Sequence, residues 1–313
     1  MNEIDSIEEA LFSRIGEEVI IEKTPTGSDE VPPVLMHNPA PARPFEFLVR
    51  LLAIPRYGSI DPTFLVGLFV PLFFGIMLGD VVYGVALLTL ALLANHRFRR
   101  RSAALRDLSR VFILSSGWAI VWGVIYGEYL GDLGHRWFGI EPIWLNREEA
   151  LEPLLLFAIA IGATHITLGL LLGIYQAITS RQRKATVERV TLLFTLIALF
   201  SLAAVAAEVL PGALLTPSFA VIAVALVILM VLEGGMGIVM APLEVIGLVG
   251  NVLSYLRIAA LGVASVYLAR VANELGAAAP LAVGVLVATL FHALNLALGA
   301  FSPTVQALRL HYV

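Results

Sequence analysis

The chain has 313 residues, of which 59% are hydrophobic and 14% are charged, with a formal net charge of −4 and a mean hydropathy of +0.89. Soluble domains are about 45–50% apolar and about 25% charged, so the composition predicts a polytopic membrane protein with little soluble mass. The absence of cysteine excludes disulfides, thiolate metal sites and cysteine nucleophiles. No phosphate-binding loop or common hydrolase signature is present, and nothing suggests a nucleic-acid partner. We expect no enzyme, cofactor or metal site in this chain alone.

Residues 1–60 differ from the rest. They start with an acidic stretch around Glu8 and Glu18 and continue through a proline-rich segment between Pro32 and Pro44. The first apolar run is broken and follows acids rather than a basic region, so no signal peptide is expected. We therefore expect a short cytoplasmic remnant and an extended, proline-rich linker over 1–60, followed by a transmembrane domain over 61–313.

Long apolar runs fill the second part, and a span needs roughly 20 mostly apolar residues. The runs lie at about 63–95, 109–131, 151–178, 187–208, 217–240, 243–274 and 279–310. The first is interrupted between Pro71 and Gly84, so it is either one tilted helix or a hairpin of two short ones. Basic loops stay cytoplasmic, and a hairpin keeps the arginine-containing linker on the side of the basic loops 97–110 and 181–189. We prefer the hairpin, which predicts an all-α bundle of about eight transmembrane helices with both termini cytoplasmic.

The last two runs carry polar strips. Asn251, Ser254 and Arg257 step by three residues, so on one helix they form a strip that drifts around its surface. Polar and small residues of the last run share one continuous face: His292, Asn295, Gly299, Ser302, Gln306 and Arg309. Each run exceeds about 30 residues, or roughly 45 Å of helix, against a hydrocarbon core of about 30 Å. Both helices are therefore expected to be long and tilted.

Ionisable residues at bilayer depth are costly and are candidates for function. Arg257 is the sharpest case, because a guanidinium whose pKa exceeds about 12 stays charged and must face a carboxylate or water. The structural alternative for Arg257 is an ion pair. Other ionisable residues inside the apolar runs are Asp80, Glu128, His165, Glu233 and Glu244. For each of these, hydrogen bonding to a neighbour or a position at the membrane interface is the alternative.

The ionisable residues divide into two groups. Asp80, Glu128 and His165 are expected toward the non-cytoplasmic side, and Glu244 on the cytoplasmic side, with Arg257 between them. This arrangement predicts two aqueous half-channels separated by a fixed cation. A mobile carboxylate on a partner would carry protons past the barrier, since it is ionised beside the arginine and must be protonated in lipid.

Four segments, in this order, resemble the membrane part of subunit a of rotary V/A-type ATPases, called subunit I in prokaryotes. The resemblance covers about residues 45–313. The short loops of this chain favour a prokaryotic member of the family. The segments are Pro71-Leu72-Phe73-Phe74-Gly75-Ile76-Met77-Leu78-Gly79-Asp80 with Tyr83-Gly84, Trp122-Gly123-Val124-Ile125-Tyr126-Gly127-Glu128, Ser254-Tyr255-Leu256-Arg257 and Gln306-Ala307-Leu308-Arg309-Leu310-His311-Tyr312-Val313.

The resemblance implies eight spans, a position in the prokaryotic cell membrane, and two long tilted helices against a rotating proteolipid ring. Peripheral-stalk and central-stalk subunits and membrane lipid are the other implied partners. Arg257 and Arg309 would be the paired arginines at the ring, Gln306 a ring-facing polar residue, and Glu244 part of the cytoplasmic half-channel. The remaining candidates for ion translocation are Asn251, Ser254, His292, Asn295 and Ser302, with Asp80, Glu128 and His165 on the outer side.

The sequence departs from the family pattern in three ways. The large cytoplasmic arm is absent apart from residues 1–44, and the chain stops at Val313, which suggests a fragment. Gly299 stands where vacuolar members carry a glutamate, so another group must line that half-channel. A secondary transporter or ion channel with its own site at a broken helix is the main alternative, and a membrane scaffold is a third. Whether the ion is a proton or sodium stays open, because residues of the ring set it.

Overall fold

The computed structural model of the 313-residue chain describes residues 11–14, 36, 38–52, 60–98 and 100–311. Two compact units are distinguished. Residues 11–14 are helical and belong to the first unit. Most of the predicted cytoplasmic remnant lies outside the described residues, and the remaining elements all belong to the second unit.

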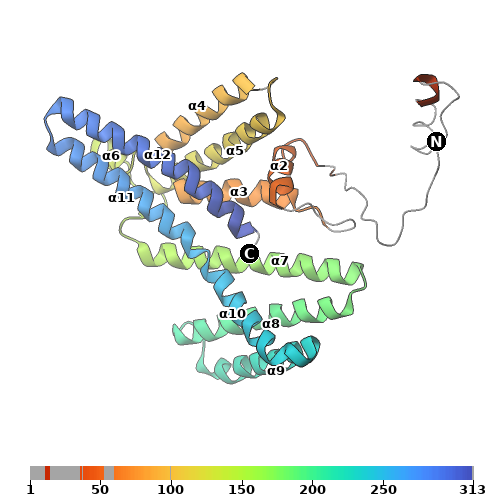
Figure 1. Cartoon of the computed structure of the whole chain (residues 1–313). Coiled ribbons are helices and arrows are strands. Elements are labelled where there is room, and N and C mark those ends of the chain that lie inside the picture. Colours follow the sequence, from red (N-terminus) through yellow and green to blue (C-terminus); the bar gives the residue numbers. More distant parts are fainter. Residues whose placement is uncertain (1–10, 15–35, 37, 53–59, 99, 312–313) are drawn as a thin grey trace. The chain divides into compact units, whose positions relative to one another are not determined.

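The second unit is helical, and no strand occurs among the residues that the structure describes. This confirms the predicted all-α class. The helices in chain order (Figure 1) are α2 (Arg43–Leu52), α3 (Thr63–Leu78), α4 (Val81–Phe98), α5 (Ala103–Tyr126), α6 (Leu133–Phe138), α7 (Leu151–Thr179), α8 (Arg183–Ala206), η1 (Gly212–Leu214), α9 (Leu215–Glu233), η2 (Gly234–Met236), α10 (Gly237–Leu253), α11 (Leu256–Ala278) and α12 (Leu281–His311).

Six helical segments in the described part of the chain are long and apolar enough to cross a membrane. One of them, Gly212–Ala278, contains α9, α10 and α11 together, and α3 is a shorter apolar helix of 16 residues. The chain is therefore a membrane protein with several spans. The count of eight stays a prediction, as does the tilt of the last two helices.

The first apolar run is a pair of helices, as the hairpin interpretation predicts. α3 ends at Gly79, whose φ of 39° lies in the left-handed region that glycine adopts without strain. Asp80 then begins α4, since its Oδ1 accepts hydrogen bonds from the amides of Val82 and Tyr83 at 2.9 and 3.0 Å. This is the geometry of a helix N-cap, so the two residues together account for the break.

Part of the segment predicted as an extended linker is a docked helix. α2 packs against α3 and α5, with Phe45, Leu48 and Val49 buried. Asn38 ties the start of α2 to the start of α3, donating to Glu46 Oε1 at 3.2 Å and Asp61 Oδ2 at 2.8 Å. Amphipathic spacing in residues 43–52 was a signal for this helix, because apolar residues recur on one face.

The Asp61 carboxylate accepts hydrogen bonds from both sides of this junction, from Asn38 and from Thr63. Partial burial works to raise the pKa of Asp61, but hydrogen bonds from Thr63 and Asn38 outweigh burial and lower it. The ionised carboxylate therefore holds the α2–α3 corner together at neutral pH.

The run predicted as one helix over 243–274 is divided. α10 ends at Leu253 and α11 begins at Leu256, so the prediction of a single continuous helix is wrong. Between them the Tyr255 amide bonds the Val252 carbonyl at 3.1 Å and the Ile258 amide bonds the Tyr255 carbonyl at 2.9 Å. These i to i−3 bonds tighten the turn as in a 3₁₀-helix and interrupt the α-helical ladder. Figure 1 shows the change of direction between α10 and α11.

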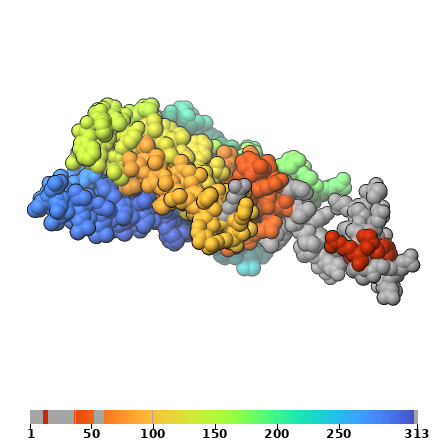
Figure 2. Space-filling model, turned by 90° about the horizontal axis from the view of Figure 1, so that it is seen from above, coloured from red at the N-terminus to blue at the C-terminus, as the bar shows by residue number. Residues whose placement is uncertain are grey.

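α11 and α12 form an antiparallel pair (Figure 1), joined by a two-residue connection after Ala278. α12 has 31 residues without interruption, as predicted. In the space-filling view the blue surface of this pair forms one continuous area beside α4 and α5 (Figure 2). Large apolar side chains are exposed along one face of α12: Leu286, Leu290, Leu294, Leu298, Phe301 and Val305.

Close packing between α4 and α5 gives a test of the fold. A Cβ atom at Gly123 would lie 2.4 Å from the Val81 amide nitrogen, whereas nothing lies within 4 Å of one at Gly117 on the same helix. We expect Gly123→Ala to destabilise the bundle by about 1–3 kcal/mol through overpacking. Gly117→Ala is the matched control and should keep or slightly raise stability, because alanine favours helix. Thermal unfolding of the detergent-solubilised chain measures both, and equal midpoints would contradict the packing.

Candidate functional site

The site is built where the start of α11 meets the end of α12. Arg257 lies in the first turn of α11, and its Nη1 donates to Gln306 Oε1 of α12 at 2.7 Å. No described carboxylate pairs with Arg257. Arg309 follows Gln306 by about one helical turn and is exposed. Two guanidinium groups therefore lie close to a neutral amide at one end of the helix pair.

The break before α11 changes the predicted polar strip. Asn251 lies on α10, Ser254 lies in the turn and Arg257 lies on α11, so the three residues do not form a strip on one helix. The Ser254 hydroxyl donates to the Gly250 carbonyl at 2.9 Å and serves the end of α10. Asn251 lines a separate cavity, described next.

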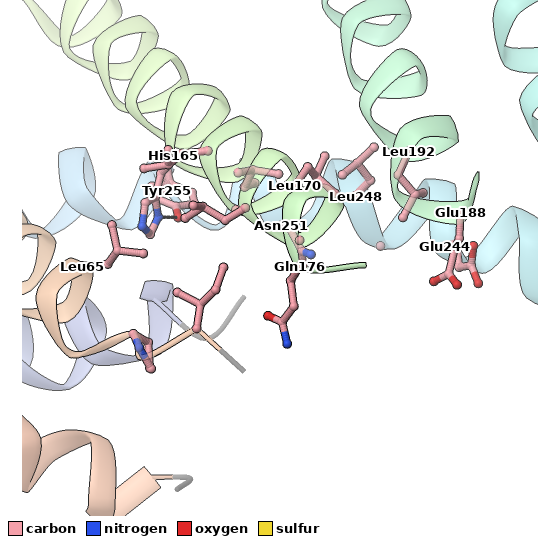
Figure 3. A pocket seen from close by; sticks show the side chains of 18 residues that line it. Leu65, His165, Leu170, Gln176, Glu188, Leu192, Glu244, Leu248, Asn251 and Tyr255 are labelled. Carbon is pink, nitrogen blue, oxygen red and sulfur yellow. Dashed lines mark hydrogen bonds between the residues drawn. The ribbon is translucent and has the colours of Figure 1, made fainter. Parts of the chain in front are cut away.

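A cavity of about 620 Å³ opens between α7, α8, α10 and the start of α3 (Figure 3). We call it the Glu244 cavity. Glu244 and Glu188 lie together at one end, and His165 and Tyr255 lie at the other. Its polar lining consists of His165, Gln176, Glu188, Glu244, Asn251 and Tyr255. The cavity thus leads from an acidic end to the residue that precedes α11 and Arg257.

Glu188 and Glu244 line the acidic end, and Glu233 and Lys184 lie close enough to act on Glu244 electrostatically. Lys184 Nζ pairs with Glu233 Oε1 at 2.9 Å, so Glu233 has a fixed partner. One oxygen of Glu244 is buried and accepts no hydrogen bond within the described part of the chain. Glu244 therefore presents a buried carboxylate oxygen that can accept a proton.

Contrary to the sequence prediction, His165 does not lie with Asp80 and Glu128. It lines the Glu244 cavity instead. Its Nδ1 forms a short hydrogen bond with the Tyr255 hydroxyl, and its ring packs against Phe69 and Phe73 of α3. The grouping failed because it rested on depth along α7, whereas the crossing of α7 and α11 decides which cavity the ring faces.

Asp80 and Glu128 are held by fixed partners. Asp80 is buried and accepts three backbone hydrogen bonds, from Val82, Tyr83 and the Gly131 amide at 2.9 Å. Glu128 forms a two-point ion pair with Arg147, whose Nε lies 2.7 Å from Oε1. Both carboxylates fasten the loop after α5 to the α3–α4 corner, which is a structural task.

Arg147 is the residue that the sequence interpretation missed. It is 1% exposed, and besides Glu128 it donates to the carbonyls of Met77 at 3.2 Å and Gly79 at 3.0 Å. Its guanidinium thus caps the C-terminal end of α3, where unpaired carbonyls carry partial negative charge. Burial acts to lower the pKa of Arg147, but the neighbouring Glu128 carboxylate acts to raise it. The net pKa lies above the usual arginine value, so Arg147 stays charged. The one available signal was Glu128 itself, which needs a partner when buried.

Residues of the strip predicted on α12 form hydrogen bonds to neighbouring helices, and a lined pathway along the strip stays a prediction. Buried Asn295 Nδ2 donates to the Ser265 carbonyl at 2.8 Å and to the Tyr83 hydroxyl at 3.1 Å. His292 lies 2.7 Å from the same hydroxyl through Nδ1. Ser302 lines a cavity of about 130 Å³ between α3, α11 and α12, together with Asn295 and Gly299. We call it the seam cavity.

The Glu128–Arg147 pair gives a test of the frame around the site. Replacing one member of a buried pair leaves an uncompensated charge and costs about 3–5 kcal/mol. We expect Arg147→Gln to lower the thermal unfolding midpoint strongly, and Arg106→Gln, which removes a partly exposed pair with Asp107, to change it little. The double variant Glu128→Gln/Arg147→Gln should lose less than the sum of the singles, and strict additivity would contradict the direct pairing.

Comparisons with known proteins agree on one family. No protein-family model matches the chain. The chain is similar to A-type ATP synthase subunit I of Methanocaldococcus jannaschii, with 28% identity covering 92% of this chain and 47% of the relative. The same protein of Archaeoglobus fulgidus is 30% identical over 90% of this chain and 51% of the relative. That of Thermococcus kodakarensis is 32% identical over 90% of this chain and 45% of the relative.

The chain spans about half the length of the curated relatives it matches. The matched part covers 90–92% of this chain. With its membrane-crossing helices and the four signature segments in order, the chain belongs to the subunit I family of A-type and V-type ATP synthases.

Proposed function

We propose that this chain is the membrane part of a rotary ATPase stator, which conducts protons along a proteolipid ring and catalyses no covalent step itself. The observation that carries the proposal is the Arg257–Gln306 contact at 2.7 Å, with no described carboxylate paired to the arginine. A permanent cation at bilayer depth is unfavourable unless a partner neutralises it. A ring carboxylate that arrives at Arg257 supplies that partner.

The barrier follows from charge. A ring carboxylate beside Arg257 is held ionised and releases its proton, since an opposite charge favours the charged form. Arg257 also repels protons that move directly between the two sides. Gln306 orients the guanidinium without neutralising it, because an amide carries no net charge. The ring carboxylate must then be protonated before it re-enters lipid.

The Glu244 cavity is the proposed cytoplasmic half-channel. Its volume of about 620 Å³ admits water, and Glu244 and Glu188 at its acidic end can exchange protons with the cytoplasm. His165 and Tyr255 end the cavity immediately before α11. In this arrangement His165 belongs to the cytoplasmic path, together with Asn251.

The exposed apolar face of α12 is the proposed contact with the ring. Leu294, Leu298, Phe301 and Val305 line it at helical spacing, and Gln306 and Arg309 lie at its end. Peripheral-stalk and central-stalk subunits are the other proposed partners. The proposed location is the cell membrane of a prokaryote, with both termini cytoplasmic.

A secondary transporter is the alternative, and one observation favours it. The break at Ser254 and Tyr255 gives the second half of the chain an interrupted helix, as α3–α4 gives the first, and interrupted helices form transporter sites. The similarity to ATP synthase subunit I supports the stator instead. Ion flux through vesicles that contain this chain without a ring would favour the transporter.

The first test replaces Arg257. In vesicles that contain the complete complex, we expect Arg257→Ala to abolish ATP-driven proton uptake, because the ring carboxylate loses the cation that discharges it. Arg97→Ala, on the exposed end of α4, is the matched control and should retain uptake. Co-purification of the ring checks assembly. Uptake by an intact Arg257→Ala complex would contradict the barrier.

The second test replaces Glu244. We expect Glu244→Gln to slow proton uptake less than Arg257→Ala does, since water in the 620 Å³ cavity can replace one carboxylate of its wall. Initial rates in the same vesicles measure the effect. Equal loss in the two variants would contradict the assignment of Glu244 to a water-filled half-channel.

A further inference from the structure

A line of hydrogen bonds crosses the bundle on the side of α11 away from the Glu244 cavity. It starts at Asn295, which donates to the Tyr83 hydroxyl at 3.1 Å, and passes to His292 Nδ1 at 2.7 Å. His292 Nε2 lies 2.9 Å from Asn273 Oδ1. Three helices contribute, α4 with Tyr83, α11 with Asn273 and α12 with the other two residues.

Both ends of this line open into cavities. Asn295 lines the seam cavity, which has room for several water molecules and extends to Ser302, one helical turn from Gln306. At the other end Asn273 Nδ2 donates to Asp132 Oδ1 at 2.7 Å. Asp132 lines a cavity of about 340 Å³ formed by the loop after α5 and the second half of α11. The line therefore bridges a small cavity near Arg257 and a polar cavity at the opposite end of α11.

The network determines which histidine nitrogen carries the proton. Asn273 uses its amide group as a donor to Asp132 and to the Leu130 carbonyl, at 2.7 and 2.9 Å. Its Oδ1 can only accept, so His292 Nε2 donates to it. Nδ1 is then an acceptor, and the Tyr83 hydroxyl donates to it. Tyr83 in turn accepts from Asn295, so each hydrogen bond in the line has a defined direction.

We infer that His292 and Tyr83 form the proton-exchanging pair of the second half-channel, between the seam cavity and the cavity of about 340 Å³ that Asp132 lines. The amides of Asn273 and Asn295 orient the pair, because a neutral amide does not titrate. Histidine is suited to the exchange, since it titrates near neutral pH and has two nitrogens with separate partners. This inference rests on the proposed stator function and deepens it.

One proton enters and one leaves in each exchange. A proton carried by water from the seam cavity past Asn295 adds to the Tyr83 oxygen as the hydroxyl proton moves to His292 Nδ1, which leaves a neutral tyrosine and an imidazolium. Asn273 Oδ1, the partner of Nε2, accepts a hydrogen bond but no proton. Release therefore requires the Asn273 amide to give way to a water molecule, which takes the Nε2 proton, and turning of the ring restores the starting tautomer. The same steps run in reverse for the opposite direction.

The charged groups nearest this pair have fixed partners: Asp80 accepts from the Tyr83 amide, and Glu128 pairs with Arg147. Asp132 pairs with Arg136, and Arg270 pairs with Glu148 and Glu274 on the loop side. Within the described parts of α4, α11 and α12, His292 contacts only the neutral side chains Tyr83 and Asn273 by hydrogen bond. Its protonation therefore depends on exchange through the line.

The test measures ATP-driven proton uptake by vesicles that contain the complete complex, across a pH range of about 5 to 8. We expect His292→Gln to lower the rate about tenfold or more and to flatten its pH profile, with the ring still co-purified. Tyr83→Phe removes one hydroxyl with little change of volume and should also lower the rate and alter the profile. His96→Gln, on the exposed end of α4, is the matched control and should behave as the wild type.

The outcomes separate this inference from the function on which it rests. Wild-type rates and pH profiles in both His292→Gln and Tyr83→Phe would overturn the inference and leave the pair as a packing contact. A lower rate with an unchanged pH profile would also overturn the inference. The substitution would then have changed the packing of the path, and not a group that titrates in it. Uptake by an Arg257→Ala complex would instead refute the stator function itself. A wild-type complex that transports sodium but not protons would overturn the inference and keep the arginine barrier.

Discussion

A charged or polar side chain inside an apolar bundle needs a partner within the protein, because lipid offers none. Arg147 meets this requirement completely, with Glu128 and the last carbonyls of α3 around it. Arg257 meets it with a single neutral amide. Arg147 thus completes the fold, whereas Arg257 has no charged partner within the described part of the chain.

The frame held by Arg147 also positions the polar line along α12. Asp80 caps α4 and binds the Gly131 amide, so the loop after α5 is fixed against the α3–α4 corner. Tyr83, one turn into α4, then reaches His292 and Asn295. Residues that satisfy the backbone therefore determine where the residues with exchangeable protons lie.

The turn between α10 and α11 separates the two cavities. Tyr255 lies in this turn, closes the Glu244 cavity and bonds His165, while Arg257 two residues later faces α12. Residues two positions apart on a helix face nearly opposite sides, since they lie about 200° apart. Tyr255 accordingly faces the Glu244 cavity and Arg257 faces the seam between α11 and α12.

The sequence by itself determined the helical membrane class, the α3–α4 hairpin and the family, because composition, breaks in apolar runs and short ordered motifs are local signals. Only the tertiary structure decided the partners. Three hydrogen-bonded pairs show this: Glu128–Arg147, His165–Tyr255 and Tyr83–His292. Their members lie 19, 90 and 209 positions apart in the sequence. Such pairings depend on how helices cross, and helical periodicity specifies a face but not the helix that it meets.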